Sequence, residues 1–295
     1  MTTTVAAVGT FDGVHLGHKA VINALKEIAE KDNCEAIAIT FDRHPLSLIA
    51  PERTPKSITT IQVKERLLKK AGVRPVVLTF DETLRTTSAV DFMKKLHDDF
   101  GVRKLVVGYD NTFGSDGINL SIHDYKDIGG AIGIEVEEAP FVEGISSSMV
   151  RKTIKAGHID AAKRMLGREY SLSGTVVSGN KLGRTIGFPT ANLSVNPDLI
   201  IPGNGVYAAR ASMPDGKELP AMVNIGTRPT IRRGDDFVVE AHVIGWEGDL
   251  YEKNITLKFL SRLRDEIRFN SIDSLKLQLK ADREATIKAQ DEKIG

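Results

Sequence analysis

The first half of the chain alternates short apolar runs with segments of helical periodicity, and this alternation constrains the fold most strongly. The apolar runs span residues 5–8, 36–41, 76–80 and 105–108. Helical patterns between them span residues 20–31, 62–70 and 88–99. Nearly continuous apolar runs are typical of parallel strands that are covered on both faces. The order predicts βαβ units and a doubly wound α/β domain, whose ligands lie at the carboxyl ends of the strands.

The second half changes character near Gly167. Its strand candidates span residues 173–177, 206–212, 221–225, 238–244 and 255–260. Clusters of glycine, proline and asparagine separate them, and convincing helices are missing until residues 271–288, where Ile272, Leu275 and Leu279 form one stripe. This spacing predicts a compact antiparallel barrel with a closing C-terminal helix. We therefore expect an α/β domain over residues 1–165 and an all-β domain over residues 166–295, with the boundary in a polar stretch.

Composition excludes several classes of protein. Lysine plus arginine number 40 against 39 aspartate plus glutamate, so the net charge of +1 argues against a nucleic-acid-coating protein but permits small anionic ligands. The single cysteine, Cys34, cannot form an internal disulfide, which favours a cytoplasmic location. No window approaches the ~18 apolar residues of a membrane span, and the first residues lack the basic segment of a signal peptide.

A motif rich in glycine and histidine follows the first strand directly. Residues 9–18 read GTFDGVHLGH and lead into a helical segment. Glycines let the backbone approach a phosphate, and a helix N-terminus offers free N–H groups and partial positive charge. His15 and His18 lie three residues apart, so both can donate to one phosphate and stabilise charge that develops there.

The alternative interpretation of this motif is structural. Gly9 and Gly13 would then serve a tight turn, and the histidines would cap or pack. The order of strand, glycines, histidines and helix favours the phosphate interpretation. A zinc site is disfavoured because no third ligand lies at a natural spacing.

A second motif lies in the predicted barrel. Residues 183–193 read GRTIGFPTANL. Glycines in a barrel loop permit close backbone approach to phosphate, and Thr190 and Asn192 present neutral oxygens that suit magnesium and ATP. The alternative is a hairpin rich in glycine, proline and asparagine that binds no ligand.

The N-terminal motif resembles the His-x-Gly-His signature of nucleotidyltransferases and, in its fuller form, bacterial FAD synthetases. Residues 40–45, 107–114 and 145–151 are similar to further motifs of that family. The resemblance implies adenylyl transfer from ATP to FMN, with His15, His18 and Arg151 as catalytic residues. It implies ATP or phosphate binding by Gly9, Phe11, Asp12, Gly13, Gly17, Ser147 and Ser148, and flavin binding by His44, Pro45 and Asp110. Taken alone, the serines and Arg151 are equally compatible with a helix cap followed by a surface arginine.

The barrel motif resembles riboflavin kinases, including the kinase module that is fused to bacterial FAD synthetases. Residues 202–207, 224–230, 239–242, 249–251 and 263–266 follow in the order of that family. The resemblance implies phosphorylation of riboflavin by ATP. It implies ATP binding by Gly183, Gly187 and Pro189, magnesium binding by Thr190 and Asn192, and flavin binding by Arg264.

For Glu240, the residue pattern and the family resemblance lead to different predictions. Alternation along residues 238–244 places Glu240 and His242 on one face and Val239 and Ala241 on the other, which predicts a solvent-facing glutamate. The resemblance instead implies that Glu240 is the catalytic base. A primary hydroxyl needs such a carboxylate to orient it and accept its proton.

The two resemblances together imply a bifunctional enzyme that uses ATP and Mg²⁺ on riboflavin and FMN. We expect no nucleic-acid or membrane partner and a monomer or weak homo-oligomer, although no sequence feature argues for association. Three residues depart from the family pattern. Asn111 stands where the family usually has an aromatic residue, Arg43 stands where it has a proline, and Met149 stands at a position that is often basic. Three alternatives stay open: a kinase with a vestigial first domain, a nucleotidyltransferase for another acceptor, and a flavin-binding regulator. Glu240 argues against the regulator, because binding alone needs no base.

Overall fold

The computed structural model describes residues 3–108, 112–140, 142–179, 182–227 and 237–291. The chain divides into two compact units, Met1–Ser147 and Ser148–Gly295. The division falls at the start of α7 (Ser147–Lys155), and α8 (Ile159–Leu166) follows within the second unit. The domain boundary that we expect between residues 165 and 166 stays a prediction.

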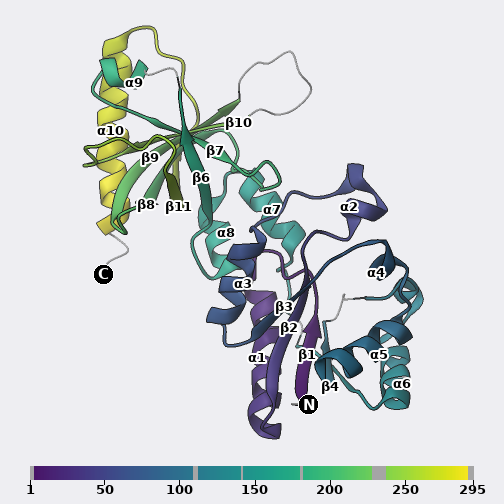
Figure 1. Ribbon diagram of the computed structural model, residues 1–295. Coiled ribbons are helices and arrows are strands. Elements are labelled where there is room, and N and C mark those ends of the chain that lie inside the picture. Colours follow the sequence, from purple (N-terminus) through teal and green to yellow (C-terminus); the bar gives the residue numbers. More distant parts are fainter. Residues whose placement is uncertain (1–2, 109–111, 141, 180–181, 228–236, 292–295) are drawn as a thin grey trace. The chain divides into compact units, whose positions relative to one another are not determined.

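The first unit is built on a parallel five-stranded sheet in the order β3-β2-β1-β4-β5 (Figure 1). Its strands are β1 (Thr4–Val8), β2 (Glu35–Phe41), β3 (Arg74–Leu78), β4 (Val102–Val107) and β5 (Glu135–Glu138). The order reverses at β1, which pairs with β2 on one side and β4 on the other. The carboxyl end of β1 is therefore the topological switch point, where doubly wound sheets bind ligands.

Helices cover both faces of this sheet, as a doubly wound fold requires. The helices of this unit are α1 (Leu16–Asp32), α2 (Leu46–Ile49), α3 (Ile61–Lys70), α4 (Glu82–Thr86), α5 (Ala89–Phe100) and α6 (Ile122–Ile132), with short 3₁₀ turns η1 (Pro51–Arg53) and η2 (Gly117–Asn119). Val5 and Ala7 pack with α1 and α3, whereas Ala6 and Val8 pack with α5 and α6 (Figure 1). The predicted α/β class is confirmed, and Ser88 caps α5 as expected, its Oγ accepting from the backbone of Asp91.

The sequence analysis missed β5 and α6. β5 has the sequence EVEE, and it lies at the edge of the sheet. Charged residues are common on edge strands because they discourage further pairing, so the apolar pattern of a central strand is absent. Lys104 on β4 balances this charge, with its Nζ 2.8 Å from Asp32 and 3.2 Å from Glu135. α6 contains two glycines that weaken its helical pattern, and a capping box between Ser121 and Asp124 begins it.

The second unit is a closed antiparallel barrel in the order β10-β7-β6-β11-β8-β9, which confirms the predicted class. Its strands are β6 (Ser171–Val177), β7 (Ala191–Val195), β8 (Gly205–Ser212), β9 (Glu218–Thr227), β10 (Phe237–Val243) and β11 (Asn254–Arg264), and its remaining helices are α9 (Leu182–Thr185) and α10 (Ile272–Asp291). We did not predict β7, because it lies inside the motif interpreted as a ligand loop. It becomes a strand by pairing with β6 and β10, so long-range pairing decided it.

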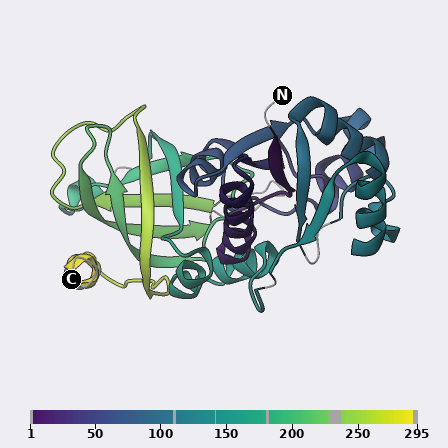
Figure 2. The same ribbon diagram turned by 90° about the horizontal axis from the view of Figure 1, so that it is seen from below.

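Helix α10 runs beside the barrel and contacts β8, β9 and β11 (Figure 2). Its most buried residues are polar: Asp282, Thr286 and Gln290, spaced four apart. The Gln290 amide donates to Ala209 O on β8 at 3.3 Å. Of the predicted stripe, Leu275 and Leu279 line a pocket, whereas Ile272 at the start of the helix is 60% exposed. Within the described residues, no helix has the length and apolar character needed to cross a bilayer.

We predict that Phe259→Ala destabilises the barrel by about 3–5 kcal/mol, because it removes a fully buried ring from the core. The Phe259 ring centroid lies 6.0 Å from that of Tyr170 and 5.6 Å from that of Tyr207. Denaturant unfolding monitored by circular dichroism measures the change. The control is Leu277→Ala on α10, where the side chain is 68% exposed, and it should change stability by less than about 0.5 kcal/mol. Equal losses in both variants would contradict the assignment of the core.

Candidate active sites

The loop between β1 and α1 places two histidines at the positive end of a helix. His15 is the N-cap of α1, and its Nδ1 accepts a hydrogen bond from the backbone N–H of His18 at 3.3 Å. The two imidazoles are stacked, with ring centroids 3.7 Å apart. The Phe11 ring meets His18 edge-on at 5.3 Å. The arrangement presents two imidazoles and the N–H groups of a helix terminus at the switch point, which suits an anion.

Strained backbone shapes this loop. Phe11 and Val14 have φ of 46° and 40°, and Gly13 has φ of 82°. A Cβ at Gly13 would lie 2.9 Å from the side chain of Ile58, so glycine is needed for space as well. Non-glycine residues in the left-handed region cost of order 1–3 kcal/mol each and persist where their surroundings hold them. Such strain clusters at functional sites.

The buried carboxylate of Asp12 is one of the groups that hold the loop. It accepts from the backbone N–H of Ile58 at 2.9 Å and of Thr59 at 3.2 Å, and Gly13 N–H donates to the Thr59 hydroxyl at 3.3 Å. Asp12 therefore contacts the segment before α3 rather than presenting its carboxylate to a phosphate. Ser147 reaches the same loop, donating from Oγ to Asp12 O at 3.1 Å.

Two further glycines of the motif allow close packing. A Cβ at Gly17 would lie 3.1 Å from the ring of His15, and one at Gly9 would lie 3.4 Å from the ring of Phe11. Both glycines therefore make room for the side chains that form the site.

The structure describes most, but not all, of the other residues that were predicted for the first site. His44 and Pro45 follow β2, which neighbours β1; His44 Nδ1 accepts from Leu46 N at 3.1 Å, and Pro45 begins α2. Asp110 lies outside the described residues, as does Asn111. Ser148 and Arg151 lie on α7 in the second unit, so their approach to the histidines stays a prediction.

The sequence analysis missed one buried cation at this site. Lys64 on α3 is only 9% exposed, and its ammonium donates to Thr10 O, Thr40 Oγ1 and Phe41 O at 3.0, 2.8 and 3.0 Å. Burial lowers the pKa of Lys64 to about 8. A signal existed in the sequence: Lys64 lies four residues before the buried Leu68, on the inward stripe of its helix.

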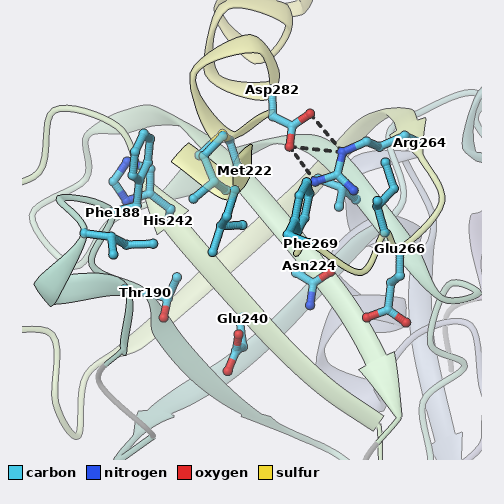
Figure 3. A pocket seen from close by; sticks show the side chains of 16 residues that line it. Phe188, Thr190, Met222, Asn224, Glu240, His242, Arg264, Glu266, Phe269 and Asp282 are labelled. Carbon is cyan, nitrogen blue, oxygen red and sulfur yellow. Dashed lines mark hydrogen bonds and ion pairs between the residues drawn. The ribbon is translucent and has the colours of Figure 1, made fainter. Parts of the chain in front are cut away.

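Glu240 lies in a pocket of about 360 Å³ on the outside of the barrel (Figure 3). Strand register places it between Asn192 on β7 and Asn224 on β9, so the three side chains share one face. Val239 and Ala241, which alternate with it, are buried in the barrel. The predicted solvent-facing environment was wrong. Glu240 is half-buried, and residues after β11 and on helix α10 line the same pocket.

The pocket combines apolar walls with convergent polar groups. It is lined by the side chains of Phe188, Met222, Phe269, Leu275 and Leu279, together with Thr190, Asn224, Glu240, His242, Arg264 and Glu266. Figure 3 shows Thr190, Glu240 and Glu266 on the side away from α10. The sequence analysis did not assign roles to Asn224, His242 or Glu266, although all three lie in segments that match the kinase family. Residues 228–230 of one such segment lie outside the described residues.

Arg264 is held by helix α10. Its Nη2 lies 2.7 Å from Oδ2 of the buried Asp282, and its Nε donates to the same carboxylate at 3.0 Å. The predicted flavin-binding residue therefore lines the pocket while its guanidinium is paired (Figure 3). Asp282 carried no signal in the sequence, because a charge on a C-terminal helix usually faces solvent.

The magnesium-binding role predicted for Thr190 and Asn192 stays a prediction, and the structure shows the surroundings of both residues. Asn192 is 7% exposed, and Thr190 lies two residues earlier on the same side as Glu240. A Cβ at Gly179 would lie 2.0 Å from the Asn192 amide nitrogen, so only glycine leaves room for this side chain. Hydroxyl, amide and carboxylate oxygens fit Mg²⁺, which commonly takes few protein ligands and completes its shell with phosphates and water.

Glycine is needed at two positions of the loop before β7. Gly183 lies on α9, where a Cβ would come 2.2 Å from Phe188 O, and Gly187 has φ of 84°. Pro189 O accepts a hydrogen bond from Nδ1 of His242 at 2.8 Å. The loop is thereby tied to β10 beside Glu240.

A second, smaller pocket of about 70 Å³ adjoins Thr190. Trp246, Tyr251 and Leu250 contribute to its walls, and the Arg184 guanidinium lies 6.0 Å from the Tyr251 ring centroid. Thr190 lines both pockets, so two ligands can meet at this residue.

We predict a pH dependence that originates at His242. Burial lowers its pKa below the ordinary value of 6.5, so the unfolded chain binds the proton more readily than the folded barrel. The free energy of unfolding should therefore fall as pH drops from 7 to 5. Denaturant unfolding of His242→Asn should show less pH dependence than the parent chain. An unchanged pH dependence in the variant would contradict this assignment.

The comparisons with known proteins match both halves of the chain to families. A family model described as FAD synthetase matches residues 1–153, and one described as riboflavin kinase matches residues 166–290. A bifunctional riboflavin kinase/FMN adenylyltransferase of Pseudomonas fluorescens is 35% identical, covering 94% of this chain and 90% of the relative. A protein of the same name from Escherichia coli K12 is 36% identical over 94% of this chain and 90% of its own length.

A solved structure is also similar over almost the whole chain. It is described as a macrolide-efflux protein from Streptococcus pneumoniae, with a TM-score of 0.87 and 32% identity, covering 97% of this chain and 94% of that one. Two family models in sequence and relatives of matching length agree with the two folds and their motifs. The chain belongs to the bifunctional riboflavin kinase/FMN adenylyltransferase family.

Proposed function

We propose that the two activities of this family are carried by separate units of the chain, riboflavin phosphorylation by the barrel and FMN adenylylation by the α/β unit. The observation that supports this division best is Glu240, a carboxylate placed by strand register at the base of a largely apolar pocket. A planar, mostly apolar ring system with a polar side chain suits such a pocket. Riboflavin has this chemistry.

In the barrel, the larger pocket takes riboflavin, whose ring lies against Phe188, Met222 and Phe269. Glu240 orients the ribityl 5′-hydroxyl and accepts its proton as the oxygen attacks the γ-phosphorus of ATP. A new phosphorus–oxygen bond forms, the bond to the β-phosphate oxygen breaks, and ADP leaves. The products are FMN and ADP.

The smaller pocket takes the nucleotide of ATP, since its aromatic walls adjoin Thr190. Gly183, Gly187 and Pro189 then lie along the phosphates. Thr190 and Asn192 would hold Mg²⁺, which neutralises charge on the phosphates when bound. Arg264 forms part of the flavin wall, fixed there by Asp282.

In the α/β unit, the FMN phosphate attacks the α-phosphorus of a second ATP, and pyrophosphate leaves as FAD forms. The FMN phosphate is already anionic, so this step needs no general base. His15, His18 and the N-terminus of α1 stabilise the charge that develops. The catalytic role of Arg151 and the phosphate-binding role of Ser148, which the family resemblance implies, stay predictions. Gly9, Gly13 and Gly17 let the loop pack closely, so that the N–H groups at the start of α1 can face the phosphates. Ser147 and Asp12 act by holding the loop, and His44, Pro45 and Asp110 contribute to flavin binding.

The remaining expectations complete the proposal. We place the enzyme in the cytoplasm, with small-molecule substrates, no nucleic-acid or membrane partner, and a monomeric or weakly associating state. The single cysteine and the balanced charge support this view.

The test is to incubate the pure protein with riboflavin, ATP and magnesium and to resolve the flavins chromatographically. We expect FMN and then FAD to accumulate. FMN without FAD would contradict the proposed adenylylation and support a kinase alone. The absence of FMN would contradict the kinase assignment, and flavin binding without turnover would support a regulator.

Matched variants assign the two steps. Glu240→Gln should lower FMN formation by about 10²–10⁴-fold, because the amide cannot accept the proton, while added FMN is still converted to FAD. His18→Ala should have the opposite effect, lowering FAD formation while FMN formation persists. Equal losses of both activities in either variant would contradict independent sites.

A further inference from the structure

We propose that Lys64 is a positioning residue for adenylyl transfer: its buried ammonium holds the carboxyl ends of β1 and β2 in the geometry that the histidine loop requires. This inference rests on the proposed function of the first unit. Lys64 comes from α3, a helix that contributes neither the glycines nor the histidines of the site. The role assigned to it is to act through the backbone, without touching the substrate.

The contacts of Lys64 define this role. Its Nζ donates to Thr10 O at 3.0 Å, to Phe41 O at 3.0 Å and to Thr40 Oγ1 at 2.8 Å. The Thr40 hydroxyl donates in turn to Thr10 O at 3.0 Å. An ammonium has three N–H donors, and all three are used within the protein. Lys64 therefore acts on the loop and not as a phosphate ligand.

The hydrogen bond from Lys64 to Thr10 O lies next to the strained part of the loop. Thr10 directly precedes Phe11, whose φ of 46° is strained and whose ring lies against His18. Asp12 anchors the other side of Phe11 through Ile58 and Thr59. Lys64 and Asp12 thus hold the strained residue from both sides. Loss of the Lys64 bonds should let Phe11 relax and should move the imidazole of His18.

The hydrogen bonds that Lys64 donates to the loop depend on pH, because its ammonium can lose a proton. The charged groups that face the ammonium are Asp12 after β1, Asp42 after β2 and Glu65 on its own helix; they favour the charged form, but burial outweighs them. The pKa of Lys64 falls from 10.5 to about 8. Above that pH the neutral amine has only two N–H groups, so one of its three acceptors loses its donor.

Deprotonation of Lys64 is expected to lower the rate of adenylyl transfer but to raise the free energy of unfolding. A loss of activity through displaced residues can therefore be told apart from a loss through unfolding. Between pH 8 and 10.5 the unfolded chain binds the Lys64 proton and the folded chain does not. This group therefore makes unfolding harder, not easier, as pH rises through that window. A fall in adenylyl transfer at this pH would come from local geometry.

The first experiment uses the unmodified enzyme. FAD formation from added FMN and FMN formation from riboflavin are measured separately between pH 7 and 9, with thermal unfolding in the same buffers. We expect kcat/KM for FAD formation to fall about 10-fold by pH 9, because about one Lys64 in ten stays protonated there, while FMN formation does not follow. A level profile, or an equal fall in both reactions, overturns the inference.

The second experiment compares Lys64→Met with Lys69→Met, an exposed lysine on the same helix. Lys64→Met should lower kcat for FAD formation by about 10-fold or more, with a smaller change in KM, and should abolish the fall between pH 7 and 9. Its kinase activity and that of Lys69→Met should match the parent chain. Retention of parental FAD formation and of its pH profile in Lys64→Met overturns the inference. If the unmodified enzyme forms no FAD at any pH, the proposed function fails with it.

Discussion

Strand register is the constraint on which both candidate sites depend. In the barrel, β10 pairs with β7 and β9, and this places Asn192, Glu240 and Asn224 in one row. In the α/β unit, β1 pairs with β2 and β4, so the loop that carries the histidines begins where the sheet reverses its order. A shift of one residue would turn Glu240 into the barrel core and bring Val239 or Ala241 outward. The hydrogen-bonded pairing of the strands thus determines where the side chains of both candidate sites lie.

Individual buried charges, rather than a charged surface, are found at the two candidate sites. The net charge is +1, yet the described residues include buried charges at both sites. Lys64 donates three hydrogen bonds to the ends of β1 and β2, and Asp282 pairs with Arg264 beside the larger barrel pocket. Removing one partner of such an arrangement leaves an uncompensated buried charge, which is costly. Buried charges of this kind give a small site a fixed geometry without a charged surface.

Local patterns predicted most of the fold. Apolar runs identified β1 to β4 and five of the barrel strands, because buried central strands are apolar and turns between them are rich in glycine and proline. They failed for β5, whose edge position allows acidic residues, and for β7, whose sequence resembles a loop. In each case a long-range contact overrode the local preference.

The sequence by itself determined the two fold classes, the phosphate motif before α1 and the family resemblance, because these depend on periodicity and on residues that are adjacent in the chain. Tertiary structure decided the environment of Glu240, the pairing of Arg264 with Asp282 and the burial of Lys64. Alternation shows that Glu240 points out of the barrel core but not that residues of a distant helix line the same pocket. Likewise, no local pattern places the ammonium of Lys64 against the carbonyls of Thr10 and Phe41, since packing of α3 on the sheet brings them together.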